Sequence, residues 1–433
     1  MALIITSCDV LDVEPSQSIS SDGAISSPND LERALMGCYD AMQSAGYYGR
    51  DYLVVPDLVA DNLEFTGTSQ DYGAANNNVI SPDLLLVEAV WASIYRTINR
   101  ANNALYYLPG VSNLSSDAAE NYEGELRFIR ALGYFDLVRL FGGVPLRELP
   151  ALSAGSDLDI PRSSKEDVYD FIIRELIAAK SLISNTRNGR ATQAAAQALL
   201  ARAYLYTGDH ENAWDAANTV IEEFGYTLEP NYDDIFQTDF SSESIFEIEF
   251  NEQDGNRIAQ YFAPRPAGRY EFGVTENIIA LYHEDDTRFF ASIDTLTNAD
   301  MPAVAKYVDV QLGSDNVVVI RLAEMYLIRA EAELNRPSPI LADVIADINT
   351  IRDRAGLIDT NASTSQDLEA EILNQRRLEF AFDGHRWFDL IRVGKAIEVL
   401  ENVTSVNQLL FPIPQSEILS NEAITPDDQN PGY

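Results

Sequence analysis

Apolar residues recur at helical spacing over most of the chain from residue 28 onward. The first predicted helix begins at Ser27-Pro-Asn-Asp30, with Asn29 or Asp30 as its N-cap, and it carries Leu31, Leu35 and Met42 on one face. The same spacing predicts further helices at 88–107, 121–141 and 165–183. The chain is therefore predicted to be mostly α-helical.

The most regular piece of the pattern is a pair of helices within residues 191–224. Gly208 ends the first helix, and the small Ala213 and Ala217 let the second helix approach it closely. This hairpin resembles a tetratricopeptide unit, and a weaker copy covers residues 321–354. Such units bury their apolar faces only by stacking, so we expect a helical-repeat scaffold.

Two segments interrupt the helical pattern. Residues 46–83 are rich in Gly, Asn, Tyr and Ser and are predicted to form long loops, and residues 251–275 form an irregular segment rich in aromatic rings. Strict alternation predicts a strand at 244–250, and 309–319 is a second strand candidate. No linker composition separates these parts, so one compact unit is expected.

The charge balance restricts the possible ligands. The 433 residues carry 30 Lys and Arg against 68 Asp and Glu, a formal net charge of −38. Such a surface repels phosphate backbones and anionic lipid headgroups, so a nucleic-acid partner is excluded. A polyanionic ligand would need a local basic patch, whereas a neutral ligand meets no such barrier.

The start of the chain has the form of a bacterial lipobox. Ile5-Thr-Ser-Cys8 follows a short apolar stub, and Cys8 is the expected lipid anchor, with residues 1–7 as a residual signal-peptide segment. The charged part and most of the apolar part of a secretory signal are missing before it. The other cysteine, Cys38, is expected in the core, so neither a disulfide framework nor a zinc cluster is predicted.

No pattern of a catalytic, cofactor or metal site is present, and none is expected. The densest polar segment is 375–392, in which His385 could act as a base oriented by Asp383 or Asp389. The favoured interpretation is structural, because the arginines and carboxylates of this segment can saturate one another.

Four motifs resemble the SusD-like (RagB-like) family of binding lipoproteins. The motifs read Arg376-Arg-Leu-Glu-Phe-Ala-Phe-Asp-Gly-His-Arg-Trp-Phe-Asp-Leu-Ile-Arg-Val-Gly-Lys395, Leu410-Phe-Pro-Ile-Pro-Gln-Ser-Glu-Ile418 with the ending Gln429-Asn-Pro-Gly-Tyr433, Arg321-Leu-Ala-Glu-Met-Tyr-Leu-Ile-Arg-Ala-Glu331, and Ser7-Cys8-Asp-Val-Leu-Asp-Val-Glu-Pro15. They cover both ends and the repeat core in the family's order.

The resemblance implies a surface-exposed lipoprotein of the outer membrane, anchored through Cys8, with one domain over residues 8–433. It implies a non-catalytic lid on a SusC-like TonB-dependent transporter that captures a glycan or, in some members, a peptide. The acidic composition favours a neutral glycan such as a β-glucan. An intracellular helical-repeat scaffold is the remaining alternative.

Sugar recognition needs flat rings and planar polar groups on exposed loops of a rigid scaffold. The two irregular segments provide them, and the predicted glycan contacts are Tyr72, Asn76, Asn77, Asn78, Tyr261, Phe262, Arg265, Arg269 and Tyr270.

Each of these contacts has a structural alternative. The three asparagines are equally well explained as turn formers, and Phe262 as a buried anchor of its own loop. Trp91 and Trp214 lie on apolar helix faces and are expected in the core. His283 and its acidic neighbours could bind a cation, but a solvated helix end is favoured.

Overall fold

The computed structural model describes residues 25–151, 158–184, 189–298 and 300–433. Cys8 lies outside these residues. The helices are α1 Pro28–Met42, α2 Asp51–Leu58, α3 Gln70–Asn76, α4 Leu85–Tyr107, α5 Ser116–Phe141, α6 Lys165–Leu182, α7 Gln193–Thr207, α8 His210–Glu223, α9 Asp234–Gln237, α10 Ile258–Phe262, α11 Glu276–Ile279, α12 Arg288–Ser292, α13 Leu322–Leu334, α14 Leu341–Arg354, α15 Ser365–Glu379, α16 Arg386–Arg392, α17 Ala396–Val399 and α18 Gln415–Ser420.

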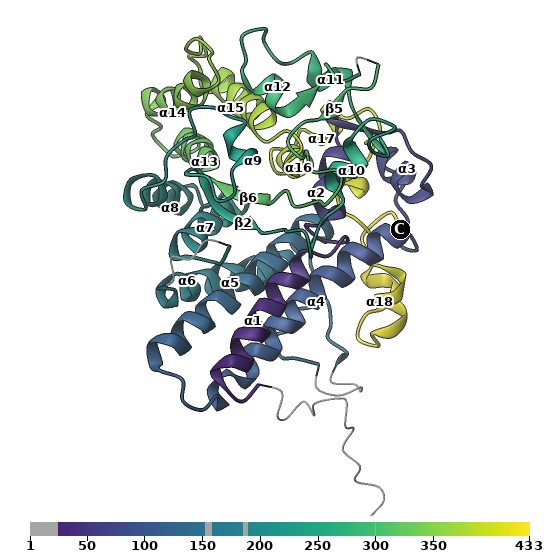
Figure 1. Cartoon of the computed structure of the whole chain (residues 1–433), viewed down its shortest axis with the longest axis vertical. Coiled ribbons are helices and arrows are strands. Elements are labelled where there is room, and N and C mark those ends of the chain that lie inside the picture. The colour runs from purple at the N-terminus through teal and green to yellow at the C-terminus, as the bar shows by residue number, and fades with distance from the viewer. Residues whose placement is uncertain (1–24, 152–157, 185–188, 299) are drawn as a thin grey trace, which may run out of the picture.

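The long helices form the expected repeat scaffold as one compact unit. Helices α1, α4, α5, α6, α7, α8, α13 and α14 pack in succession, each against the next. In Figure 1 this series follows the lower and left-hand parts of the molecule, while α2, α3 and α10 lie on the right. Gly208 ends α7 in the left-handed conformation, φ 76°, which glycine adopts without strain. The predicted hairpin is confirmed.

Helix α1 begins two or three residues earlier than the predicted N-cap implies. Ser27 is the N-cap: its hydroxyl accepts from the amide N–H of Asp30, and the Asp30 carboxylate accepts from the backbone N–H of Ser27 in return. Pro28 occupies the first helical position, where a missing N–H costs nothing. The prediction of Asn29 or Asp30 as the cap was wrong because the reciprocal capping box uses the serine.

The prediction of long loops over 46–83 was only partly right. This segment contains α2, α3 and the strand β1 (Leu63–Phe65). Every residue of α2 is buried, so the helix has no polar face and leaves no helical periodicity in the sequence. The second strand candidate was also too long, because only its last part belongs to β6 (Val317–Arg321), and a turn precedes it.

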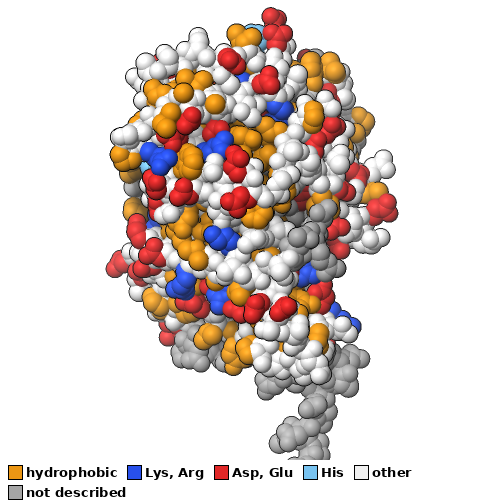
Figure 2. Space-filling model, turned by 90° about the vertical axis from the view of Figure 1, so that its left-hand side faces the viewer, with side chains coloured by type: hydrophobic (Ala, Val, Ile, Leu, Met, Phe, Trp, Pro, Cys, Tyr) orange, Lys and Arg blue, Asp and Glu red, His pale blue; other side chains and the backbone are white. Residues whose placement is uncertain are grey.

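Three small antiparallel sheets join distant segments. Strand β1 pairs with β3 (Phe272–Val274), β2 (Ser244–Ile248) pairs with β6, and β4 (Ile293–Asp294) pairs with β5 (Ala303–Val304). The strand predicted at 244–250 is confirmed as β2, which ends at Ile248. Figure 2 shows the left-hand side of Figure 1, where acidic, basic and apolar side chains are interspersed. The large negative charge is not gathered into one patch on this face.

The C-terminal motif forms a buried ion network. Glu379 is fully buried and makes ion pairs with Arg288, Arg321 and Arg354, which also lie in the interior. These guanidinium groups hold the pKa of Glu379 well below its usual range, although burial acts in the opposite direction. The arginines and carboxylates of this region therefore stabilise the fold by pairing with one another, as the structural interpretation predicted.

His385 is not placed as a catalytic base. Burial and the nearby arginines, Arg202 first among them, keep its pKa well below the ordinary value. Asp383 pairs with Lys306, and Asp389 pairs with Arg376 and Arg392, so neither carboxylate orients the imidazole. The enzyme alternative for this segment was wrong because the aspartates are engaged by stronger cationic partners.

Candidate functional site

The two segments predicted to bind the ligand meet in the fold, although about 200 residues separate them. Strands β1 and β3 pair in the register Leu63↔Val274 and Phe65↔Phe272. The pairing continues beyond the strands, since Thr66 donates its backbone N–H to the carbonyl of Glu271 at 2.9 Å. We call the surface formed by residues 46–83 and 256–272 the loop face.

A close approach of the two segments depends on Gly67. A Cβ atom at this position would lie 1.7 Å from Oε2 of Glu271, so any other residue would displace that carboxylate. Glu271 in turn fixes Arg269, whose Nε and Nη2 both donate to Oε1 at 3.0 and 2.8 Å. These hydrogen bonds raise the pKa of Arg269. A glycine in one segment thereby positions a guanidinium in the other.

The centre of the loop face is the ring of Tyr261, which two arginines contact. The guanidinium carbons of Arg50 and Arg269 each lie 4.6 Å from the ring centroid of Tyr261. Arg50 is held from behind by Asp51, at 2.6 Å, and this ion pair keeps its pKa above the ordinary value although burial opposes the charged form. The Arg269 side chain is 49% exposed, so the guanidinium that contacts the buried ring is accessible to solvent.

The aromatic rings of the loop face are buried supports of its backbone and are not exposed for stacking with a ligand. Tyr72 is buried: its hydroxyl donates to Asp51 Oδ1 at 2.6 Å, and its ring lies edge-on to Phe272 at 4.9 Å. The expectation of an exposed Tyr72 ring was wrong, because α3 turns this side chain inward. Burial and the Asp51 carboxylate hold the pKa of its hydroxyl above the usual range.

Tyr270, Phe262 and Tyr261 are also largely buried. The Tyr270 hydroxyl donates to the carbonyl of Pro302, and burial raises its pKa. Phe262 is 1% exposed and packs against Phe272. It is therefore a buried anchor of its own loop, as the structural interpretation predicted. Tyr261 is 9% exposed and lies under Arg269, so any ligand contact of this ring would be at its edge.

The three asparagines have different positions. Asn76 accepts the backbone N–H of Phe65 at 3.0 Å, and the amide of Asn78 donates to the carbonyl of Val59 at 2.9 Å. Asn78 has φ 52°, a left-handed conformation that asparagine tolerates. Both side chains therefore serve turns. Asn77 is exposed and donates to the carbonyl of Gly73 at the end of α3.

The exposed groups of the loop face are polar and project from both segments. Arg265 is exposed, and its Nε donates to the carbonyl of Arg269 at 3.0 Å. The Nη1 group of Arg269 takes no part in the two hydrogen bonds to Glu271. Further exposed side chains of this face are Glu64, Thr68, Gln70 and Asn77. Guanidinium, amide and hydroxyl groups of this kind can pair with the hydroxyls of a sugar.

The C-terminal motif supports the loop face from inside. Asp61 makes ion pairs with Arg377 and Arg386 of the motif. Asp57 accepts from the amide of Asn62 at 2.6 Å and from the backbone N–H of Gly384 at 3.0 Å. Burial raises the pKa of Asp57 to about 7. The motif residues are thus scaffold, as the sequence suggested.

Sequence reasoning missed Arg50 and Asp51. Both fall inside the segment expected to be a loop, in Tyr47-Tyr-Gly-Arg-Asp51, and no spacing rule marks them. Their roles arise from contacts with Tyr72 and Tyr261, which are distant in the chain.

Other expected features agree with the structure. Cys38 is fully buried, and burial raises the pKa of its thiol to about 12. Trp91 is in the core, and Trp214 is half-buried beneath Arg336.

Among the described residues there is no group of three or more His, Cys, Asp and Glu side chains that could hold a metal ion. His283 is 62% exposed beside Asp285 and stands at a solvated position. Within the same residues, no helix is both long enough and apolar enough to cross a bilayer.

Comparison with protein families gives two matches. Residues 291–433 match the model of the SusD family, and residues 9–205 match a family described as "Starch-binding associating with outer membrane". The matched regions include the C-terminal motif and the repeat helices up to α7.

Full-length relatives agree with these matches. The chain is 27% identical to SusD-like protein P2 of Formosa agariphila, over 100% of this chain and 98% of that protein. It is 24% identical to the starch-binding protein SusD of Bacteroides thetaiotaomicron, over 82% of this chain and 80% of that protein.

Solved structures share the fold. A SusD superfamily protein from Bacteroides vulgatus, 24% identical, aligns with a TM-score of 0.85 over 94% of this chain and 99% of that one. A laminarin-binding SusD-like protein, 27% identical, aligns with a TM-score of 0.83 over 94% of this chain and 100% of that one. The two family matches, the relatives along the whole chain and the shared fold agree: this chain is similar to SusD and SusD-like proteins over residues 9–205 and 291–433 and shares their fold.

Proposed function

We propose that this protein captures a neutral oligosaccharide or polysaccharide, such as a β-glucan, at the loop face. The observation that carries the proposal is the contact of Arg50 and Arg269 with the buried ring of Tyr261, which presents the half-exposed guanidinium of Arg269 on a rigid base. Flat groups held in place beside exposed polar side chains suit a ligand that offers both C–H faces and paired hydroxyls.

The charge of the site supports a neutral ligand. Arg50 and Arg269 are each paired with a carboxylate, Asp51 and Glu271. The charges of these two arginines are therefore neutralised locally, and the whole protein is strongly acidic. A uronate polymer would be repelled at long range and would find few unpaired cations at the site. The laminarin-binding relative of the same fold points to a neutral β-glucan as the first ligand to test.

A captured glycan must then be delivered for uptake, and we propose that it is delivered to a SusC-like TonB-dependent transporter in the outer membrane. The support is the similarity to the two matched family models, one of which names association with the outer membrane. A lipid on Cys8, outside the described residues, would tether the protein to that surface. Loss of radiolabelled palmitate in Cys8→Ala, expressed with a complete secretory signal, tests the tether. Co-purification of the transporter with the tethered protein tests the partnership.

The binding experiment is a titration of the purified protein by affinity gel electrophoresis and calorimetry. The panel contains laminarin, mannan, starch, xylan, levan, alginate and a tryptic peptide mixture. Saturable binding of a neutral glycan that Tyr261→Ala weakens at least tenfold is the expected result.

The control for Tyr261→Ala is Tyr106→Ala, which removes a half-exposed ring at the far end of α4. This control should bind like the wild type. Thermal unfolding of both variants separates loss of contact from loss of fold. Binding of peptides alone would favour the alternative that the protein captures peptides. Preferential binding of alginate would overturn the proposal that the ligand is neutral.

A further inference from the structure

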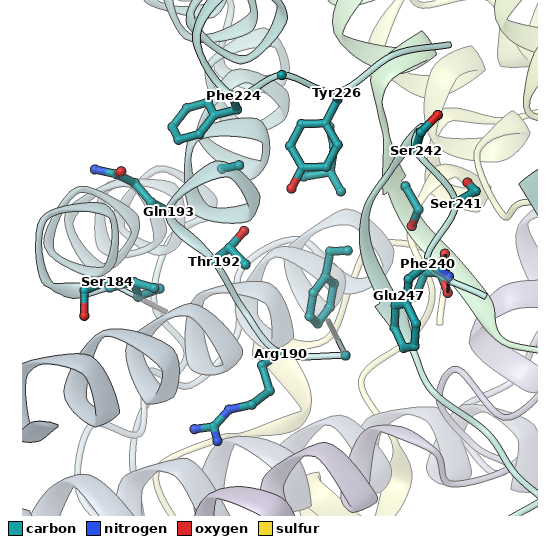
Figure 3. Close-up of a pocket in the computed structure, with 17 residues that line it drawn as sticks. Ser184, Arg190, Thr192, Gln193, Phe224, Tyr226, Phe240, Ser241, Ser242 and Glu247 are labelled. Atoms are coloured by element: carbon teal, nitrogen blue, oxygen red, sulfur yellow. Dashed lines mark hydrogen bonds between the residues drawn. The ribbon is translucent and has the colours of Figure 1, made fainter. Parts of the chain in front are cut away.

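A second concave site lies on the repeat scaffold, away from the loop face. It is a cavity of about 510 Å³ between the start of α7, the end of α8 and the segment that leads into β2. Figure 3 shows its side chains placed around an open centre. None of the residues of the loop face lines it. A cavity of this size falls in the range of small-molecule sites.

Four aromatic residues line this cavity, of which Phe246 is buried and the other three are partly exposed. Phe224 and Tyr226 follow α8, and Phe240 precedes β2, and each of the three is only half-buried. Burial raises the pKa of the Tyr226 hydroxyl, and the Thr192 side chain at the N-cap of α7 acts against this shift. Half-exposed rings that face a shared hollow are a platform for the C–H faces of a sugar, and the loop face lacks such exposed rings.

Phe240 is held in a conformation that a bulky residue rarely adopts. Its φ is 54°, in the left-handed region. Both carboxylate oxygens of Glu247 accept its backbone N–H at 3.1 Å, which stabilises this conformation. The left-handed turn places the Phe240 ring at the wall of the cavity, beside Gly189. A strained backbone that is maintained by a buried carboxylate points to a role for the ring.

The polar groups of the cavity are uncharged or already paired. Glu247 is engaged by Phe240 and by the amide of Asn316, and Arg190 is paired with Glu125. The Ser241 hydroxyl is buried, lines the cavity and has no hydrogen-bond partner among the described residues. Gln193 and Ser242 are exposed at its edge. These hydroxyl and amide groups suit a neutral, hydroxyl-rich ligand.

A second concavity lies beside this cavity. It has a volume of about 280 Å³, shares Gly189 and Glu247 with the first and is lined by Asp40 and Glu249, both exposed. These carboxylates disfavour an anionic chain beside the cavity.

From these observations we propose that the protein has a second saccharide-binding site, formed by Phe224, Tyr226, Phe240, Ser241 and Gln193, which takes a neutral disaccharide or the end of a longer neutral chain. This site is independent of the loop face. A second contact on one protein would raise the avidity for a long glycan without a new contact at the first site.

The test uses two cavity variants and one loop-face variant. Phe240→Gly removes the ring. Because glycine adopts the observed φ without strain, the substitution should not disturb the backbone. Gln193→Trp places a large side chain at the exposed edge of the cavity. Arg269→Ala alters the loop face. Phe290→Ala, which truncates a 62% exposed ring on α12, is the matched control for a lost phenylalanine.

The probes are laminaribiose, cellobiose, maltose, mannobiose and xylobiose, titrated into the full chain by calorimetry, with laminarin in parallel. We expect one disaccharide to bind with an affinity that both cavity variants reduce at least tenfold and that Phe290→Ala leaves unchanged. A crystal soaked with that disaccharide should show it against Phe240.

The outcomes separate this site from the proposed function. Disaccharide binding that only Arg269→Ala weakens, or no disaccharide binding at all, overturns the second site. Laminarin binding that is lost in Arg269→Ala would then still support glycan capture at the loop face. Laminarin binding that depends on the cavity variants alone would overturn the loop face and retain the second site.

Discussion

The loop face and the buried ion network contain the same kinds of residue but use them in opposite ways. In the network, Glu379, Arg321 and Arg354 are at most 4% exposed and satisfy one another. On the loop face, Arg269 is 49% exposed and keeps one end of its guanidinium toward solvent. The difference teaches that a dense polar motif marks scaffold when its charges pair internally. We propose that the binding groups are the sparser ones, which the scaffold leaves incompletely paired.

The largest effect is expected from Glu379→Gln. The change leaves Arg288, Arg321 and Arg354 buried around a neutral group, which should cost about 3–5 kcal/mol of unfolding free energy. Urea unfolding followed by circular dichroism measures it. Glu276→Gln, on an exposed surface, is the control and should change stability by less than about 0.5 kcal/mol. Equal stability of the two variants would contradict a structural role for the motif.

The next effect concerns Asp57, which links the two regions. Its pKa in the folded protein is about 7, above the ordinary value of about 4, because the carboxyl is buried. Between these values the folded state holds a proton that the unfolded state has released. The unfolding free energy should therefore fall as pH rises from about 4 to 7, by up to about 1.4 kcal/mol per pH unit.

Urea unfolding at several pH values, compared between wild type and Asp57→Asn, isolates this contribution. Other buried carboxyls, including Glu125 and Asp347, also have raised pKa values and are common to both proteins. The variant should show a shallower decline over this pH range. Parallel pH profiles would show that Asp57 is ionised in the fold.

A smaller effect, on binding and not on folding, is expected from Arg269→Ala. Loss of a charge-assisted hydrogen bond to the glycan should weaken binding about tenfold. Because the side chain is half exposed, stability should stay within about 0.5 kcal/mol of the wild type. Calorimetry with the glycan identified in the panel measures the affinity. Arg174→Ala, an arginine 61% exposed on α6, should leave binding intact; a similar loss there would point to unspecific electrostatics.

The smallest effect is expected from Asn77→Ala. Its amide donates to the carbonyl of Gly73 at the end of a short helix, and the side chain is exposed. As a turn former it should alter glycan affinity less than about threefold, which is below about 0.7 kcal/mol. Titration of this variant distinguishes the two interpretations of Asn76 to Asn78. A tenfold loss of affinity without loss of stability would make Asn77 a ligand contact.

The sequence by itself determined the helical scaffold and the structural nature of the C-terminal motif. Helical periodicity and the glycine at position 208 reflect local physics, so the hairpin of α7 and α8 could be predicted from its own residues. Residues 375–392 likewise contain both arginines and carboxylates, so a structural role through charge pairing could be predicted from the segment itself. The four motifs indicated the family for the same reason, since each is contiguous in the chain.

Only the tertiary structure decided which side chains of the two irregular segments are exposed and which are buried. Tyr72 and Tyr261 look like exposed rings in a polar segment, but packing against Phe272 buries them. Arg50 gains its role from Tyr261, more than 200 residues away. Periodicity reports only the neighbours within a helix or strand. Burial in a loop is set by contacts between distant segments, and no local pattern contains them.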